Sequence, residues 1–452
     1  MRVKVIVIAA AACVCSGPIL ATAATQEELE TRVQALAEQL EAVKEELAIL
    51  KQQRSSTLAA PVASGSALPD SMTSNSAPSS SALPEGSVAA TPGAAAERSP
   101  AGSAGGPTLF GYGELNYSRL SNDPAATTAD LARFVLGAGY RFNESTRFVS
   151  ELELEHAVSS STDVGEIEVE QAYIEHELTR GMYAKAGLIL IPSGTLNESH
   201  EPTRYYGVFR NFVETAIIPS TWREGGVALQ GFTAGGLRWD IGVTTGFDLS
   251  KWDATSEEGL ESPLGSIHQE LALARARDLS GFGAVNYTGI PGVRLGASLF
   301  SGGASQGQPG LPSAEVTLWE GHAGWAPGPW ELTGLYARGH ISGTQRINPT
   351  LVGNQALVPE SFFGWYLQAA YRALERGNWS LTPFARYERF NTAAGYADIG
   401  AGFTPAALPD RKVLTAGLNW AIAPGVVIKA DYLDFSGVGS SNRLDLGMGY
   451  QF

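Results

Sequence analysis

From Phe110 to the C-terminus, apolar side chains recur at every second position, and this period constrains the fold more than any other feature of the chain. The final stretch, RLDLGMGYQF at residues 443–452, shows it in full, with apolar side chains at Leu444, Leu446, Met448, Tyr450 and Phe452. Successive side chains of a β-strand point to opposite faces of the sheet. The period therefore predicts strands that each have one apolar and one polar face.

Earlier segments repeat the pattern, for example VRLGASLF at 293–300 and LRWDIGVTTGF at 237–247, where Phe247 is placed on the apolar face. The opposite face carries most of the charge of these segments. Its acidic members are Glu151, Glu153, Glu155, Glu166, Glu168 and Glu170. Its basic members are Arg133, Arg141, Arg238, Arg294, Arg338, Arg386 and Arg443. Within residues 108–452, half-polar strands and the lack of an equally strong helical pattern predict an all-β barrel segment.

Short and long connections alternate along residues 108–452. The short ones fall at 143–146, 178–181, 233–236, 289–292, 326–329, 374–378 and 423–425. The long ones fall at 121–130, 157–165, 191–224, 248–280, 302–315, 342–361, 391–411 and 436–442. About sixteen strands with eight long loops and seven short turns are typical of an antiparallel barrel that spans an outer membrane, with its long loops at one end.

The two faces suit such a barrel. Repeated Arg, Glu and Asp could not form the packed core of a soluble barrel, but they suit a water-filled lumen, and sixteen strands enclose a lumen too wide for side chains to fill. Lipid contacts the apolar face and offers no hydrogen bonds, so the sheet must close. The last strand is expected to pair with the first. Tyr450 and Phe452 are predicted to be the signal that the outer-membrane assembly machinery reads.

The N-terminus is typical of a secretory signal. Residues 1–23 combine a charged start, an apolar middle and an Ala-Thr-Ala cleavage site. Both cysteines, Cys13 and Cys15, fall inside this segment, so the mature protein is expected to have no disulfide and no thiolate metal or redox site.

Residues 25–53 follow a 3.5-residue apolar period. Apolar side chains alternate at spacings of four and three from Leu29 to Leu50, which is the seam of a coiled coil and favours self-association in the periplasm. The alternative is a helix that packs on its own barrel. Residues 54–107 contain Ser, Ala, Pro and Gly and no aromatic residue, which predicts a disordered linker.

The barrel segment resembles trimeric outer-membrane porins, and most closely the phosphate-selective porin O/P family. The resembling stretches are GEIEVEQAYIEHEL (165–178), YAKAGLILIPSG (183–194) and NFVETAIIPSTWREGGVALQG (211–231). They cover the first third of the barrel, and the later strands match in pattern. The resemblance implies a homotrimer of sixteen-stranded barrels, each narrowed by an inward-folded loop.

The family's anion specificity rests on lumenal Arg and on Lys clusters at both mouths. This barrel segment has only Lys185, Lys251, Lys412 and Lys429, and residues 108–452 contain 36 acidic against 24 basic residues. The charge balance therefore argues against phosphate selectivity.

Loop 191–224 is the expected constriction. It is partly apolar, as a loop packed against the wall would be, and it carries charges of both signs: Arg204, Arg210, Arg223, Glu198, Glu201, Glu214 and Glu224. Opposed charges across a pore orient polar solutes and set ion preference. For Glu214 and Arg223, near the end of the loop, pairing that only holds the loop in place is an equally good interpretation.

The predicted function is passive diffusion of small polar or charged solutes through an outer-membrane channel. A barrel enzyme is disfavoured because none of the six histidines stands in the spacing of a nucleophile–His–acid or metal site, so neither a cofactor nor a metal is expected. A tether that links the outer membrane to the periplasm or cell wall through residues 25–107 is the alternative function. The net charge of −15 gives no reason to expect a nucleic-acid partner.

Overall fold

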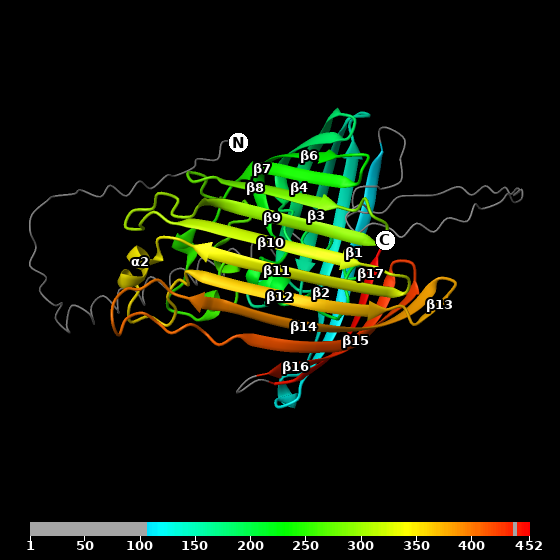
Figure 1. Ribbon diagram of the computed structural model, residues 1–452. Helices are drawn as coiled ribbons and strands as arrows, with labels where there is room; N and C mark the ends of the chain where they lie inside the picture. The colour runs from blue at the N-terminus through cyan, green and yellow to red at the C-terminus, as the bar shows by residue number, and fades with distance from the viewer. Residues whose placement is uncertain (1–105, 437–440) are drawn as a thin grey trace, which may run out of the picture. The chain divides into compact units, whose positions relative to one another are not determined.

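The computed structural model describes residues 106–436 and 441–452, and these form one antiparallel β-barrel (Figure 1). The predicted signal peptide and coiled coil, and the linker as far as residue 105, lie outside the described residues. The strands are β1 (Pro107–Leu120), β2 (Thr128–Arg141), β3 (Thr146–Glu155), β4 (Ile167–Thr179), β5 (Met182–Leu190), β6 (Arg223–Phe232), β7 (Leu237–Thr244), β8 (Ser280–Tyr287), β9 (Val293–Gly303), β10 (Glu315–Trp325), β11 (Trp330–Ile341), β12 (Ser361–Tyr371), β13 (Leu374–Arg376), β14 (Trp379–Gly395), β15 (Arg411–Ala423), β16 (Val426–Ser436) and β17 (Arg443–Gln451).

Each strand pairs with its neighbours in sequence, and the sheet closes where β1 pairs with β17. Both β12 and the three-residue β13 pair with β14, at adjacent parts of that strand. The two therefore occupy the place of a single strand in the wall. The seventeen strands therefore make a sixteen-stranded barrel, as the sequence predicts. Closure leaves no edge strand with unpaired backbone groups, which a lipid environment requires.

The outer surface is apolar along the strands and aromatic near both ends. Outward side chains such as Ile241, Leu299 and Leu367 are 51–62% exposed. Exposed aromatic rings near the short-turn end are Tyr140, Trp325, Trp330, Tyr371 and Trp420, and rings nearer the long-loop end are Phe134, Trp319, Tyr387 and Tyr432. Two aromatic belts around an apolar band are the surface expected of an outer-membrane barrel.

All the long connections emerge at one end of the barrel and the short turns at the other, as predicted. The long connections carry the short helical segments η1 (Pro124–Ala126), η2 (Val213–Ile217), η3 (Leu249–Lys251), η4 (Glu258–Leu260), η5 (Gly265–Ile267), α2 (Thr344–Ile347) and η6 (Asn348–Thr350). None of the helices in the described part of the chain has the length and apolar character needed to cross a membrane.

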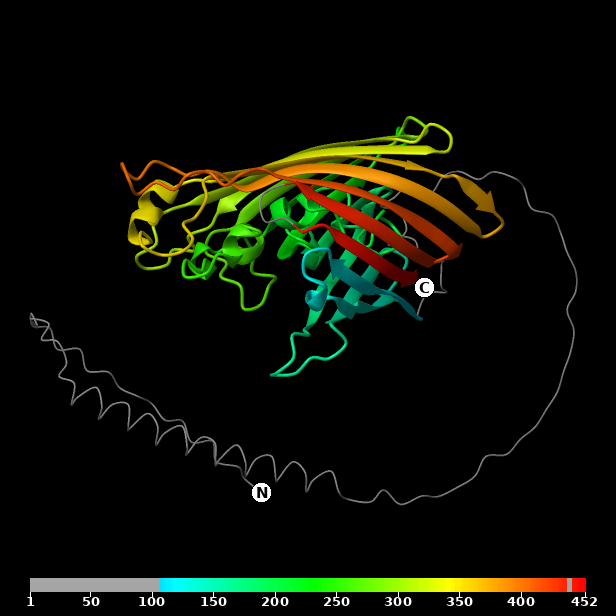
Figure 2. The same cartoon turned by 90° about the horizontal axis from the view of Figure 1, so that it is seen from below.

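Part of the interior at the long-loop end is a packed apolar core, contrary to the expectation that the lumen would be too wide to fill. Residues of the connections 191–222, 245–279 and 342–360 contribute to this core, and Figure 2 shows α2, which belongs to the last of them, at the long-loop end of the barrel. Phe247 lies beyond the end of β7, not on its lipid face, and its ring is 5.4 Å from both Trp222 and Phe300. Loop residues fill the lumen where wall side chains alone could not reach across it.

Two further predictions need correction. Arg338 is exposed on β11 opposite Trp319, whose ring lies on the outer surface, so it does not face the lumen. The prediction assigned the wrong face of β11 to the lumen. Leu335, Ala337 and Gly339 occupy its inward positions, so Arg338, which lies between the last two, points outward. The predicted loop 191–224 is also two residues too long, since Arg223 and Glu224 begin β6.

The closing seam packs the two C-terminal aromatic rings over glycines. Phe452 and Gly111 exchange backbone hydrogen bonds of 2.9 and 3.1 Å. A Cβ atom on Gly111 would lie 2.9 Å from the Phe452 ring, and one on Gly113 would lie 2.5 Å from the Tyr450 hydroxyl. Only glycine at these positions leaves room for the rings against the backbone of β1.

Candidate functional site

Loop 191–222, between β5 and β6, crosses the lumen and is hydrogen-bonded to the wall on the far side. The backbone N–H of Val208 donates to Asp431 of β16 at 2.6 Å, and that of Phe212 donates to Glu388 of β14 at 2.7 Å. Arg386 donates to the Tyr206 carbonyl at 3.0 Å. These buried carboxylates and the guanidinium satisfy loop backbone groups that would otherwise lack partners.

Glu214 holds the returning half of the loop. Its buried carboxylate accepts hydrogen bonds from the Leu196 N–H (2.8 Å), Asn211 Nδ2 (2.8 Å) and the Tyr366 hydroxyl of β12 (3.0 Å). Gly194 allows this approach, because its φ is +76° and a Cβ there would lie 2.4 Å from a Glu214 oxygen. Glu214 thus links both limbs of the loop to β12.

The apolar side chains of the loop lie against the wall, as the sequence predicts. Val213, Ile217 and Ile218 are at most 1% exposed and belong to the internal core. Phe212 stacks on Phe390 of β14, with ring centroids 5.4 Å apart.

Two cavities lie inside the barrel. One of about 790 Å³ is lined by residues at and near the short turns, and one of about 340 Å³ lies between the loop and strands β1–β3 and β14–β17. The larger is lined by four of the predicted residues: Arg141, Glu198, Arg238 and Arg294. The smaller is lined by five of them: Arg133, Glu155, Arg210, Arg386 and Arg443. Both are large enough for water and small polar solutes.

The smaller cavity contains one arginine without an acidic partner. Arg133 pairs with Glu114 at 2.8 Å. Arg210 donates instead to the hydroxyls of Ser220 (2.8 Å) and Thr221 (2.9 Å), and it forms no ion pair among the described residues. Burial, and then the nearby Arg133 charge, lower the pKa of Arg210 from its usual value. Arg210 therefore brings to this cavity a positive charge without a direct ion pair among the described residues, and the Glu114 carboxylate attracts it from farther away.

In the larger cavity the charges are mostly paired. Arg238 lies 2.6 Å from Glu198 and 2.8 Å from Asp240, and Arg294 lies 2.9 Å from Glu331. Burial favours the neutral form of Glu198, but Arg238 outweighs it and keeps the pKa of this carboxyl below its usual value. A wall of such pairs is polar and nearly neutral.

The remaining predicted residues line neither cavity. Glu151, Glu153 and Glu201 are buried, and Arg223 is buried in ion pairs with Glu168 and with Glu270 (2.8 Å). The Nε atom of Arg204 is buried and receives no partner among the described residues.

Three further residues that line the smaller cavity were not predicted from the sequence: Glu114, Tyr205 and Asp431. Glu114 and Asp431 occupy inward positions of β1 and β16, so the two-residue period could have identified them. No sequence signal points to Tyr205, whose hydroxyl donates to Glu114 at 2.7 Å, because its position depends on the path of the loop.

Known proteins with a similar sequence or a similar fold were found for this chain. No protein-family model matches the chain. An uncharacterized protein of Aquifex aeolicus (strain VF5) is 29% identical over 340 residues, which are 73% of this chain and 75% of that protein. Salmonella typhi OmpF in complex with daunomycin superposes with a TM-score of 0.54 and 14% identity, covering 77% of this chain and 98% of that one. An anion-selective porin from Comamonas acidovorans gives a TM-score of 0.50 and 13% identity, covering 77% and 99%. At these identities the likeness shows the fold: this chain has the barrel fold of outer-membrane porins.

Proposed function

We propose that this protein is an outer-membrane porin through which small polar and charged solutes diffuse passively, and that loop 191–222 narrows its channel. The observation that carries the proposal is a closed barrel with an apolar outer face, whose lumen holds polar cavities and an inward loop fixed to the wall. Such a surface suits lipid, and such a lumen suits water and ions.

The outer membrane is the location that this architecture supports. The aromatic belts match two membrane interfaces, and the segregation of long loops from short turns matches loops outside the cell and turns in the periplasm. The N-terminal segment 25–107 would then lie in the periplasm.

Arg210 is the residue that we expect to contribute most to ion preference. It adds a positive charge to the smaller cavity, whereas Arg133, Arg238 and Arg386 are each beside a carboxylate. Membership of the phosphate-selective O/P family is supported by the resembling stretches in 165–231. Phosphate selectivity is not part of the proposal, because carboxylates neutralise Arg133, Arg238 and Arg386.

Planar-bilayer recording of the purified full chain tests the proposal. Stepwise currents are expected, with a conductance that rises with salt concentration. Replacing residues 203–210 by a short Gly-Ser link should increase that conductance, because it removes the part of the loop that crosses to the far wall. Folded, reconstituted protein that carries no current would refute the channel.

A homotrimer is the assembly we propose, on the basis of the porin resemblance and the heptad pattern at 25–53. Native mass spectrometry in detergent measures it directly. Deletion of residues 25–107 distinguishes a channel function from a tether function. A porin should still conduct without this segment, whereas a tether would lose its link to the periplasm or cell wall.

A further inference from the structure

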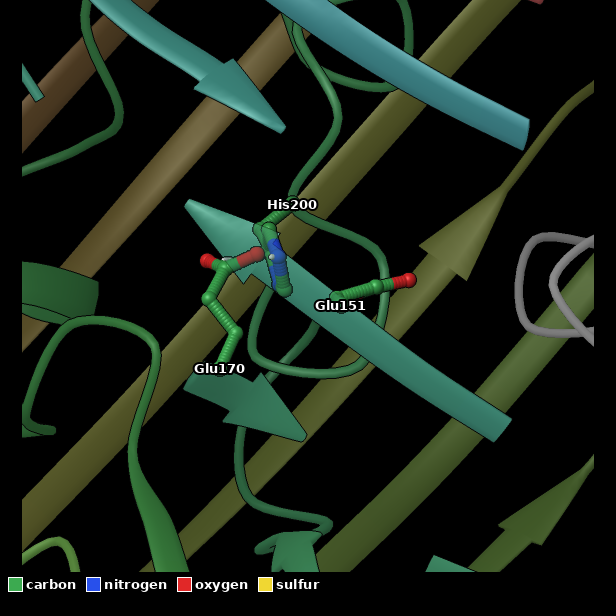
Figure 3. A group of neighbouring side chains, drawn as sticks. All are labelled: Glu151, Glu170 and His200. Carbon is green, nitrogen blue, oxygen red and sulfur yellow. Dashed lines mark ion pairs between the residues drawn. The ribbon is translucent and has the colours of Figure 1, made fainter. Parts of the chain in front are cut away.

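A histidine and two glutamates meet in a buried cluster at the start of loop 191–222. Glu151 of β3, Glu170 of β4 and His200 of the loop each bring one potential ligand atom to within 4.8 Å of the others. They are 6%, 0% and 3% exposed. Figure 3 shows the Glu170 carboxylate beside the His200 ring.

The histidine ring is oriented as a metal ligand would be. His200 Nδ1 lies 2.9 Å from the Asn197 carbonyl oxygen, which can only accept, so Nδ1 carries the hydrogen. Nε2 then faces the cluster, 2.7 Å from the Tyr112 hydroxyl and 3.4 Å from Glu170 Oε1. Metal-binding histidines commonly donate their other ring N–H to a backbone carbonyl in this way.

Two carboxylate oxygens in this region lack a hydrogen-bond donor. Oε1 of Glu170 and Oε1 of Glu153, which is two residues from Glu151 along β3, are buried and accept no hydrogen bond in the described residues. The nearest guanidinium, that of Arg133, is 3.8 Å from Glu153 and 2.8 Å from Glu114. Three buried glutamates with so little positive charge require a further cation or protons.

We propose that Glu151, Glu170 and His200 bind a divalent transition-metal ion that fastens loop 191–222 to β3 and β4. An imidazole with carboxylates suits Zn²⁺ and similar ions, whereas Ca²⁺ prefers a shell of oxygens alone. The ion would displace the hydrogen that Nε2 needs to donate to the Tyr112 oxygen at 2.7 Å, while the Tyr112 hydroxyl, which donates to Glu170 Oε2 at 2.8 Å, would orient that carboxylate. The ion would connect two strands and the loop, and this role goes beyond solute diffusion.

Zinc titration of the detergent-purified, EDTA-treated full chain by isothermal calorimetry tests the site. One saturable ion per chain is expected. His200→Gln and Glu170→Gln should each weaken binding by about tenfold or more. His322→Gln is the matched control: His322 is also largely buried beside a carboxylate, 2.9 Å from Glu320, but belongs to no three-ligand group among the described residues, so zinc affinity should not change.

Absence of saturable zinc binding to the unmodified chain would overturn the proposal, whatever the variants do, and would leave a protonated Tyr112–Glu170–His200 network. Equal affinity of a folded Glu170→Gln variant would overturn it as well. Bilayer recordings with zinc and with EDTA separate the two proposals. A chain that conducts but binds no zinc loses only the metal site, and one that binds zinc but carries no current loses only the channel.

Discussion

The two halves of the barrel wall share one outer surface but differ inside. On β9, β10 and β12, inward positions at the long-loop end hold Phe300, Leu318 and Phe362, all at most 2% exposed. On β14, β16 and β1, inward positions hold charged residues, among them Arg386, Asp431 and Glu114. The apolar half packs against inward loops, and the charged half borders the smaller cavity.

This difference assigns two requirements of a pore loop to different halves of the wall: a fixed position, and charged groups exposed to the channel. Apolar packing against one half fixes where the loop lies, and hydrogen bonds to the other half leave charged groups beside water. Side chains of the apolar half should therefore contribute mainly to stability, and side chains of the charged half mainly to ion preference. Each prediction below tests that division.

The largest expected effect is on stability, from Phe300→Ala in the apolar half. Removing a fully buried ring that contacts Trp222 and Phe247 should lower the free energy of unfolding by about 3–5 kcal/mol. Thermal unfolding followed by circular dichroism measures the loss. Leu299→Ala, on the lipid face of the same strand and 51% exposed, is the control and should cost less. If Phe300→Ala shifted the reversal potential while stability stayed the same, the division would be wrong.

Glu214→Gln weakens the link between loop and wall. The neutral amide cannot accept all the hydrogen bonds from Leu196, Asn211 and Tyr366, so a loss of about 1.5–3 kcal/mol is expected. Single-channel records should show more open-state noise, because the loop is held less firmly. Glu257→Gln, on the exposed surface of connection 245–279, should leave the noise unchanged. Equal noise in the two variants would mean that Glu214 does not anchor the loop.

Arg210→Glu should change ion preference with little loss of stability. Reversing this charge, which has no direct ion pair among the described residues, should change the free energy of a permeating ion in the smaller cavity by about 1 kcal/mol. This corresponds to a change of about fivefold in the permeability ratio, in favour of cations. Reversal potentials in a salt gradient measure this ratio. The sequence pattern suggests the same shift for Arg204→Glu, but Arg204 lines neither cavity, so its shift should be smaller. A larger shift for Arg204 would place the ion path elsewhere.

The sequence predicts the wall better than the contents of the lumen. Strand count, connections and the inward phase of Arg133 or Glu151 follow from a local two-residue period and turn composition. The internal core does not, since Phe247 reaches Phe300 only through the path of a long connection. Glu151, Glu170 and His200 lie in different elements, so no spacing along the chain could indicate their proximity. Arg338 shows that inward phase also fails where the register of a strand is misjudged.

The smallest expected effect is an acid-dependent loss of stability in connection 245–279, which packs on the apolar half. Burial favours the neutral form of Asp248, but hydrogen bonds from Ser250 and Arg275 (2.6 Å) outweigh it and hold its pKa below the usual value. A carboxyl with a lowered folded-state pKa adds stability above its unfolded pKa of about 4, and this stability is lost as the pH falls through the folded value. Because Arg275 is half exposed, Asp248→Asn should cost less than about 1 kcal/mol at pH 7.

Limited proteolysis of connection 245–279 in the Asp248→Asn variant, from pH 7 down to pH 2, measures this effect. The unmodified chain should resist cleavage better at neutral pH, and the difference should disappear toward pH 2 as Asp248 gains a proton. Asp253→Asn is the control, because the exposed Asp253 carboxylate accepts hydrogen bonds from Thr255 of its own turn and forms no ion pair among the described residues. A difference that grew on acidification would have the wrong sign for this ion pair, and the apolar packing of Leu249 and Trp252 would then be enough to hold the connection in place.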